Sequence, residues 1–260
     1  MLELLRAFGL DKPASAHGAQ IDHVLVLVHW LMILLGVGWG LYFIYVLFRY
    51  RKTANPTADY VGAKGKLSKW LEIGVVVFEA ILLLGFSIPF WAEQVDAKPE
   101  KYENAMRIHV VAQQFAWNIH YPGKDGIFGA TRPELVDSAV NPLGLDEEDP
   151  AAADDITTIN DLVVPVNQKI VIDVTSKDVI HSFFLPPMRV KQDAIPGMVV
   201  PVVFTPIETG NWQIACAQLC GNGHYRMLGQ FRVMDQDAYE SWMQEQIDYK
   251  KEDSEDEDEE

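Results

Sequence analysis

Two long apolar segments constrain the fold of this chain more than any other feature. Residues 24–48 contain no Asp, Glu, Lys or Arg, and residues 73–92 are interrupted by one charged side chain, Glu79. About 20 apolar residues in a helix are enough to cross the ~30 Å hydrocarbon core of a bilayer. We therefore predict a transmembrane helical hairpin over residues 24–92.

Two other interpretations of these segments compete with the transmembrane hairpin. A secretory signal peptide is disfavoured because the first segment is too long for an h-region, begins after residue 20 and ends at charged residues. A buried helical hairpin of a soluble protein stays open as the second alternative.

The loop between the two segments, residues 49–69, predicts the orientation. It contains one acid, Asp59, and the basic residues Arg49, Arg51, Lys52, Lys64, Lys66 and Lys69. Positive loops stay on the cytoplasmic side. The lead, residues 1–23, and everything after residue 92 should face outward, into the periplasm if this is a bacterial inner-membrane protein.

The net charge of −16 argues against nucleic acid as a partner.

Residues 93–249 carry the signals of an outward β-domain. Residues 107–121 alternate apolar and smaller or polar side chains, which predicts one half-buried strand. Further short strands are predicted at 161–166, 169–176, 197–205, 211–216 and 228–234. This number of short strands favours a sandwich or barrel. Residues 122–160 should form a long inserted loop with one helical turn near residues 132–140.

The C-terminal end is strongly acidic. An amphipathic stretch over residues 236–249 precedes the tail, residues 250–260, whose last nine positions hold eight acids. Such a segment cannot bury apolar surface, so we predict disorder. The tail is either a solvated end or an electrostatic attractant for a basic soluble partner.

Both cysteines of the chain lie in "ACAQLCGNGHYRML", residues 215–228. In an oxidising compartment Cys216 and Cys220 could form a disulfide. Two thiols followed by His224 and Met227 also provide the soft ligands that copper prefers. A further imidazole, His181, ends a β-like run before a Pro-Pro break, where alone it would be an ordinary histidine. On these residues both interpretations remain open.

The paired motifs "DVIHSF…KQDAIPG" and "CAQLCGNGHYRM" resemble subunit II of the haem-copper oxygen reductases, the cytochrome c oxidase type. The resemblance covers about residues 20–245. It implies an α+β membrane protein in which a two-helix transmembrane hairpin precedes an all-β cupredoxin-like Greek-key barrel. It also implies a binuclear CuA centre with six ligands: the side chains of His181, Cys216, Cys220, His224 and Met227, and the main-chain carbonyl of Gln218.

Two positions depart from the family pattern. The residue at this position between the cysteines is commonly Glu in the family, where it also helps to hold magnesium, whereas here it is Gln218. A neutral amide is a poorer ligand for a hard cation, so magnesium at this position is in doubt. In "QFAW", Phe115 replaces the Trp that carries electrons in from cytochrome c, while Trp117 matches the second Trp. The donor could therefore differ from the usual soluble cytochrome c.

Two acids in the second apolar helix are of interest. Glu72 matches the spacing of a family Glu at the entrance of a proton pathway, although an ordinary interfacial charge is an equal alternative. Glu79 lies deep in the predicted span, where an acid is costly and is a functional candidate by default. It could instead pair with a polar group of a neighbouring subunit.

The resemblance implies an electron-transfer subunit of a respiratory cytochrome c oxidase. The chain would accept electrons at CuA from a cytochrome c-type donor, which could belong to a larger respiratory assembly. It would pass them to haem in subunit I, which reduces oxygen to water coupled to proton translocation. The alternatives are a copper-free relative serving quinol oxidation, a membrane-anchored copper-binding or copper-delivery protein, and a receptor domain closed by a disulfide.

Overall fold

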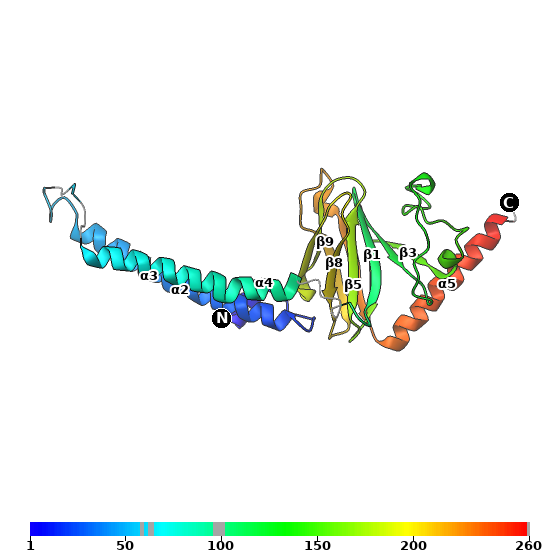
Figure 1. Cartoon of the computed structure of the whole chain (residues 1–260), viewed down its shortest axis with the longest axis horizontal. Coiled ribbons are helices and arrows are strands. Elements are labelled where there is room, and N and C mark those ends of the chain that lie inside the picture. Colours follow the sequence, from blue (N-terminus) through cyan, green and yellow to red (C-terminus); the bar gives the residue numbers. More distant parts are fainter. Residues whose placement is uncertain (58–59, 62–64, 96–101, 259–260) are drawn as a thin grey trace. The chain divides into compact units, whose positions relative to one another are not determined.

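The structure is a computed structural model that describes residues 1–57, 60–61, 65–95 and 102–258. Residues 58–59 and 62–64 of the predicted basic loop lie outside the described residues. So do residues 96–101, near the predicted start of the outward domain at residue 93. The chain divides into two compact units (Figure 1), one formed by residues 1–27 with 102–260 and the other by residues 28–101.

Long apolar helices make up most of the second unit. Helix α2 runs from Gly18 to Arg49, and the second helical segment consists of α3 (Lys66–Leu82), a π-helical turn (Leu83–Ser87) and α4 (Ile88–Val95). Among the described residues, Gly18–Arg49 and Lys66–Ala92 are long and apolar enough to cross a membrane, with mean hydropathies of 2.2 and 2.3. Their most apolar stretches are not buried in the protein, unlike the helices of a soluble core.

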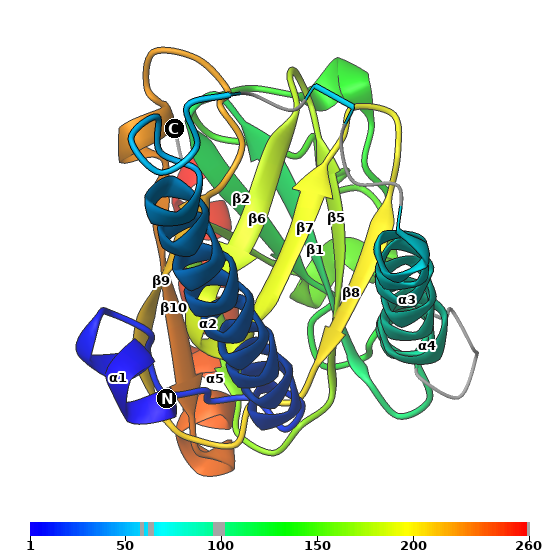
Figure 2. The ribbon, with the colours of Figure 1, turned by 90° about the vertical axis from the view of Figure 1, so that its left-hand side faces the viewer.

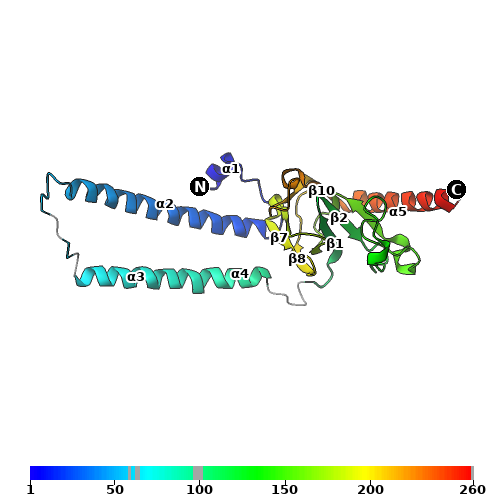
Figure 3. The same ribbon diagram turned by 90° about the horizontal axis from the view of Figure 1, so that it is seen from above.

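The lead has more structure than the sequence predicts. It begins with a short helix, α1 (Leu2–Ala7), and then runs along the β-domain into α2 (Figure 3), where the Ala16 N–H donates to the Thr205 carbonyl at 2.9 Å. Helix α2 begins at Gly18, before the uncharged segment starts at residue 24. The reason is Asp22, whose buried carboxylate is neutralised by Arg189 of the β-domain, so a charged residue is accommodated in the first turns of the helix.

Two five-stranded sheets form the β-domain, with the strand orders β3-β2-β1-β5-β8 and β4-β10-β9-β6-β7. Figure 2 shows strands of one sheet in front of those of the other. The strands are β1 (Met106–Gln113), β2 (Ala116–Tyr121), β3 (Ile156–Ile159), β4 (Asp161–Pro165), β5 (Ile170–Ser176), β6 (His181–Leu185), β7 (Val190–Ala194), β8 (Val200–Phe204), β9 (Gly210–Cys216) and β10 (Leu228–Met234).

The hydrophobic core lies between the two sheets. It contains side chains of both, and its largest fully buried members include Trp117, Tyr121, Phe183, Phe204 and Phe231. The Tyr121 hydroxyl accepts a hydrogen bond from the Val163 N–H of the opposite sheet at 2.8 Å. The fully buried phenol therefore has a polar partner, as a buried hydroxyl requires.

The prediction of one strand over residues 107–121 is wrong. The segment is a hairpin in which β1 and β2 pair antiparallel, from His109 opposite His120 to Gln113 opposite Ala116. The turn at Gln114 and Phe115 contains none of the Gly, Pro, Asn or Asp residues that usually mark turns. The sequence also did not predict strands β3 and β7, and it placed His181 at the end of a run, whereas His181 begins β6.

The predicted insertion is an ordered loop that ends at β3. It contains the predicted helical turn, at Pro133–Leu135. Carboxylates fix its backbone: Asp149 Oδ2 accepts from the Ala130 N–H at 2.8 Å, and Asp155 Oδ2 accepts from the Gly129 N–H at 2.8 Å. The same Asp155 oxygen lies 2.6 Å from Nε2 of the buried His120 in β2, which joins the loop to the barrel.

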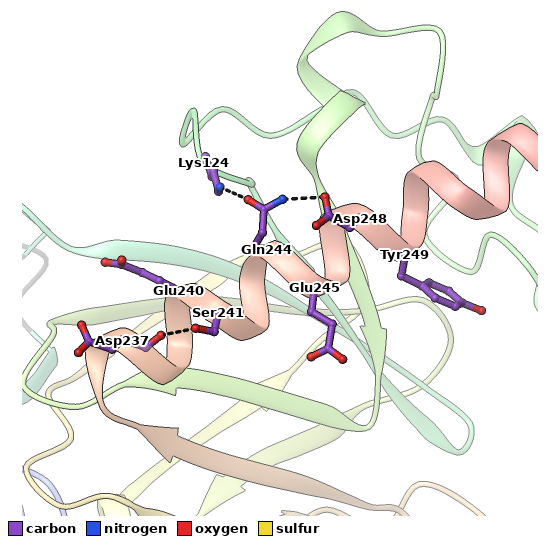
Figure 4. A pocket seen from close by; sticks show the side chains of 8 residues that line it. All are labelled: Lys124, Asp237, Glu240, Ser241, Gln244, Glu245, Asp248 and Tyr249. Atoms are coloured by element: carbon purple, nitrogen blue, oxygen red, sulfur yellow. Dashed lines mark hydrogen bonds between the residues drawn. The ribbon is translucent and has the colours of Figure 1, made fainter.

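Helix α5 (Gln236–Asp258) follows the last strand. The Asp235 side chain accepts the Ala238 N–H at 2.9 Å, which caps the helix start. One face is buried against the core through Tyr239, Trp242, Met243 and Ile247. The opposite face carries Glu240, Gln244 and Asp248, with Lys124 bonded to Gln244 (Figure 4). The helix extends to Asp258 and so differs from the disorder predicted from residue 250.

Candidate metal centre

The predicted ligands come from neighbouring strands of one sheet. His181 begins β6, which pairs antiparallel with β9 so that Phe183 lies opposite Cys216. Cys216 ends β9, and the chain returns at Leu228 as β10, the partner of β9 on its other side. The intervening loop carries the other predicted ligands. Adjacent strand ends therefore bring residues 181 and 216–227 to the same edge of the sheet.

Sulfur and imidazole atoms face one another across this edge. The Cys216 and Cys220 Sγ atoms lie 3.8 Å apart, and both cysteines are free. The disulfide alternative is therefore not the state of this structure. His181 Nδ1 lies 4.0 Å from Cys216 Sγ and 3.1 Å from Met227 Sδ. Cys220 Sγ lies 3.7 Å from His224 Nδ1.

The sixth predicted ligand is also in place. The main-chain carbonyl of Gln218 lies 3.2 Å from Cys216 Sγ. The Gln218 residue itself is exposed, so its amide is not committed to the sulfur cluster. Ligand atoms of His181, Cys216 and Cys220 all lie within 4.8 Å of one another, and the other three predicted positions each contact one or more of these residues. Cys220, Met227 and His181 are buried, and Cys216 is partly accessible.

A hydrogen-bonded support that sequence reasoning missed holds the His181 ring. Its Nε2 lies 2.9 Å from Asp178 Oδ1, which leaves Nδ1 facing the sulfurs. The other Asp178 oxygen accepts the Gln114 N–H at 2.7 Å, and the Gln114 side chain donates to the Cys220 carbonyl at 2.7 Å. The β1–β2 turn is thereby tied to both ligand segments. Asp178 stands three residues before His181, a spacing that could have signalled its role.

Charge reinforces this support. Burial alone would raise the pKa of Asp178, but hydrogen bonds from His181 and from the Gln114 and Val179 N–H groups hold that pKa below its usual value. The carboxylate is consequently ionised at neutral pH. It fixes the ring by a charge-assisted contact.

The donor set fits a soft metal ion. Burial, with Cys216 as a hydrogen-bonded neighbour, raises the pKa of the Cys220 thiol to about 11, so without a metal this thiol is protonated at neutral pH. A thiophilic ion binds the thiolate and displaces the proton. Thiolate, thioether and imidazole together are the ligands that copper prefers.

The two aromatic residues predicted for electron entry lie on different sides of the site. Phe115 packs against the ligand loop: a Cβ at Gly223 would lie 2.5 Å from its ring, and the Arg226 guanidinium carbon is 5.9 Å from the ring centre. Trp117 is fully buried and meets the His181 ring edge-on, with centroids 6.3 Å apart. Glu72 lies on α3, in the other unit.

The chain is similar to known proteins of one family. Residues 106–232 match the family model described as cytochrome c oxidase subunit II, periplasmic domain. The alternative cytochrome c oxidase subunit 2 of Bradyrhizobium diazoefficiens is 31% identical, over 90% of this chain and 83% of that protein. Cytochrome c oxidase subunit 2 of Saccharomyces cerevisiae is 30% identical, over 85% of this chain and 83% of that protein.

One solved structure is also similar, the periplasmic domain of subunit II of cytochrome oxidase of Bradyrhizobium japonicum. It is 30% identical and covers 56% of this chain and 96% of that chain, with a TM-score of 0.42.

The fold and the site define a membrane-anchored, cupredoxin-like protein with a group of copper-type ligands on the outward side. The chain belongs to the cytochrome c oxidase subunit 2 family. It is therefore an electron-transfer subunit of a haem-copper oxidase, an oxidoreductase complex of the membrane, and copper is the metal of this family.

Proposed function

We propose that this chain holds a binuclear CuA centre and relays electrons from a cytochrome c-type donor to haem in subunit I of a bacterial inner-membrane oxidase. The observation that carries the proposal is the pair of free thiols 3.8 Å apart, flanked by two imidazoles and a thioether. Two thiolates this close can bridge two copper ions. When bound, the copper pair provides a one-electron site whose charge is shared between the metals.

The residues of the chain keep such a site rigid. Cys216, Cys220, His181 and His224 would hold the copper ions, with Met227 and the Gln218 carbonyl as further ligands, and the bound copper would supply one-electron chemistry. Because His181 is braced by Asp178 and the Cys220 carbonyl by Gln114, the ligands move little when an electron arrives or leaves. A small rearrangement favours fast transfer.

Electron entry is proposed at Phe115, whose ring packs on the ligand loop beside Gly223. Trp117 stands behind His181 in the core and serves as a packing partner of the ligand. We propose that the donor docks over this region. Lys177 beside Asp178 makes the surface there less acidic than a purely carboxylate patch, so a donor with a strongly basic face is not required.

Glu72 and Glu79 are proposed to face the haem-bearing subunit. Glu72 stands near the basic end of α3, where it would begin a proton pathway, and Glu79 would find a polar partner in a neighbouring helix. Magnesium is not proposed for the Gln218 side chain, since a neutral amide is a weak ligand for that ion.

The test is spectroscopic. The purified full chain in detergent, loaded with copper, should bind two copper ions and give a purple absorbance with a seven-line mixed-valence EPR signal. His224→Ala should abolish or strongly alter this signal. The matched control His109→Gln changes a histidine on the far side of β1, stacked on Phe128, and should leave the signal unchanged. A wild-type chain without the signal contradicts the proposal.

A further inference from the structure

A buried ion pair joins the metal-bearing hairpin to the first turns of the membrane helix. Arg189 lies between β6 and β7, eight residues after the ligand His181. Its Nε donates to Asp22 Oδ1 at 2.7 Å and its Nη2 to Asp22 Oδ2 at 3.2 Å, a two-pronged contact. The side chains are 10% and 3% exposed. Asp22 belongs to α2, which continues as one helix to Arg49.

The same guanidinium binds two further segments. Nη1 donates to the Pro186 carbonyl at 2.7 Å and Nη2 to the Asp11 carbonyl at 2.5 Å. Arg189 adopts the left-handed backbone conformation, with φ of 55°, which is uncommon for a residue other than glycine. Such a conformation persists where its surroundings fix it. One side chain thus connects the hairpin, the lead and the start of α2.

The lead is laid against the barrel around this pair. The Ala14 N–H donates to the Pro187 carbonyl at 2.8 Å, and the Ser15 hydroxyl donates to the Met188 carbonyl at 2.7 Å. Ala14 and Ser15 are both 1% exposed. At Gly18 a Cβ would lie 2.7 Å from Pro13 and 3.4 Å from Arg189 Cγ, so the helix begins in close contact with these residues.

A flexible connection between the lead and the β-domain would not need a buried ion pair or a lead packed on the barrel. An exposed linker leaves its charges in water, whereas here a charged pair is taken out of water at considerable cost and its remaining donors are satisfied by carbonyl groups. In some proteins such a pair specifies one arrangement over others. Here it holds the β6–β7 hairpin, which begins at His181, against the first turns of α2.

We propose that the Arg189–Asp22 pair is a positioning clamp. It fixes the β6–β7 hairpin, which carries the proposed ligand His181, to the first turns of α2, and so keeps the proposed metal site at a constant position relative to the haem-bearing subunit. This inference rests on the proposed function. The described hydrogen bonds of this pair join Arg189 to Asp22, Pro186 and Asp11 and reach none of the proposed metal ligands, so the pair acts through the placement of the hairpin. Transfer onward to haem depends on that placement, whereas electron entry from a soluble donor does not.

The experiment uses the assembled oxidase with full-length variants of this chain. Asp22→Asn removes the charge and keeps the shape, and Arg189→Lys keeps the charge but loses the fork. Amide hydrogen exchange over residues 14–16 should rise at least tenfold in both. The copper EPR signal and the donor-to-chain rate should stay within twofold of wild type, while transfer from this chain to haem should slow at least fivefold.

Two controls separate positioning from general loosening. Lys12→Ala removes an exposed ion pair with Glu208 that joins the same lead to the barrel, and it should leave all readouts unchanged. The reversed pair Asp22→Arg with Arg189→Asp should recover part of the onward rate, since an aspartate tolerates the left-handed conformation better than most residues.

Unchanged exchange in Asp22→Asn, or raised exchange with a wild-type onward rate in both variants, overturns the clamp. A wild-type oxidase without the copper signal would instead contradict the proposed function, and the exchange result alone would then decide whether the clamp exists.

Discussion

The ligand loop, residues 216–227, and the insertion, residues 122–155, are both long irregular segments with many polar side chains, but they satisfy those side chains differently. In the insertion, carboxylates accept backbone N–H groups: Asp155 accepts that of Gly129 and Asp149 that of Ala130. The thiols, thioether and imidazole of the ligand loop, together with His181 of β6, face one another at 3.1–4.0 Å.

The difference separates a structural loop from a binding loop. Carboxylates that already accept hydrogen bonds from backbone amides hold the chain in place. These hydrogen bonds also give the buried polar groups the partners that they need for stability. Sulfur atoms make weak hydrogen bonds, so a cluster of them gains little from facing one another. A soft ion that bound these donors would add its binding free energy to the stability of the fold.

The largest effect is expected for Asp155→Ala in the insertion. The substitution leaves the buried Gly129 N–H and His120 without their partner, so it should lower the free energy of unfolding by about 3 kcal/mol. Copper binding should be unchanged. Denaturant unfolding of the full chain in detergent, with copper stoichiometry measured alongside, tests both statements.

The matched control for Asp155 is Asp125→Ala in the same insertion. Asp125 is exposed, and among the residues that the structure describes its carboxylate accepts the Ile127 N–H two residues on, so its removal should have little effect. Equal effects of the two substitutions, or loss of copper in Asp155→Ala, would show that the insertion is not the structural loop described here.

A second, smaller effect concerns pH at the sheet face under the insertion. Burial alone would raise the pKa of Asp173, but hydrogen bonds from His109 and Arg107 hold it below its usual value. A lowered folded-state pKa gives stability that is present above the unfolded value of about 3.9 and is lost as pH falls through the folded value. Asp173→Asn should therefore be less stable than wild type at neutral pH.

The pH profile is the measurement for Asp173. The difference in unfolding free energy between wild type and Asp173→Asn should be constant above about pH 5 and should shrink below about pH 4. A difference that stays constant through the acid range would mean that the Arg107 and His109 contacts do not stabilise the carboxylate.

The residues that the sequence grouped as candidate ligands lie close together in the structure, whereas several of the strands around them were not predicted. Ligand spacing within one loop is local information, so Cys216, Cys220, His224 and Met227 could be grouped before any fold was known. His181 was singled out in a second segment by its place before a Pro-Pro break, and the resemblance then grouped it with the loop; in the structure its Nδ1 lies 4.0 Å from Cys216 Sγ. Asp178 and Gln114 were missed because their roles depend on contacts across the sheet that no single segment reveals.

The fold was predictable where periodicity and composition decide it. The two membrane helices and strands β4, β5, β9 and β10 lie close to their predicted ranges. The β1–β2 hairpin was missed because its turn at Gln114 and Phe115 is held by Asp178 and by the ligand loop, not by turn-forming residues. Docking of the lead depends on Arg189, far along the chain from Asp22, so sequence patterns gave no sign of it.

The smallest effect on the copper site is expected at Gln218, whose main-chain carbonyl is a proposed ligand while its side chain is exposed. Gln218→Glu adds a carboxylate at an exposed position but leaves the main-chain carbonyl, 3.2 Å from Cys216 Sγ, where it is. If only the carbonyl serves the metal, the copper EPR signal should stay within experimental error of wild type. The carboxylate should also increase the affinity of the assembled oxidase for Mg²⁺ or Mn²⁺, because hard cations prefer charged oxygen ligands. Manganese EPR of the assembled oxidase measures that gain, with Gln213→Glu, an exposed position on β9, as the matched control. A changed copper signal would show that the Gln218 amide takes part in the site. It would contradict the prediction that only the main-chain carbonyl of Gln218 serves the metal.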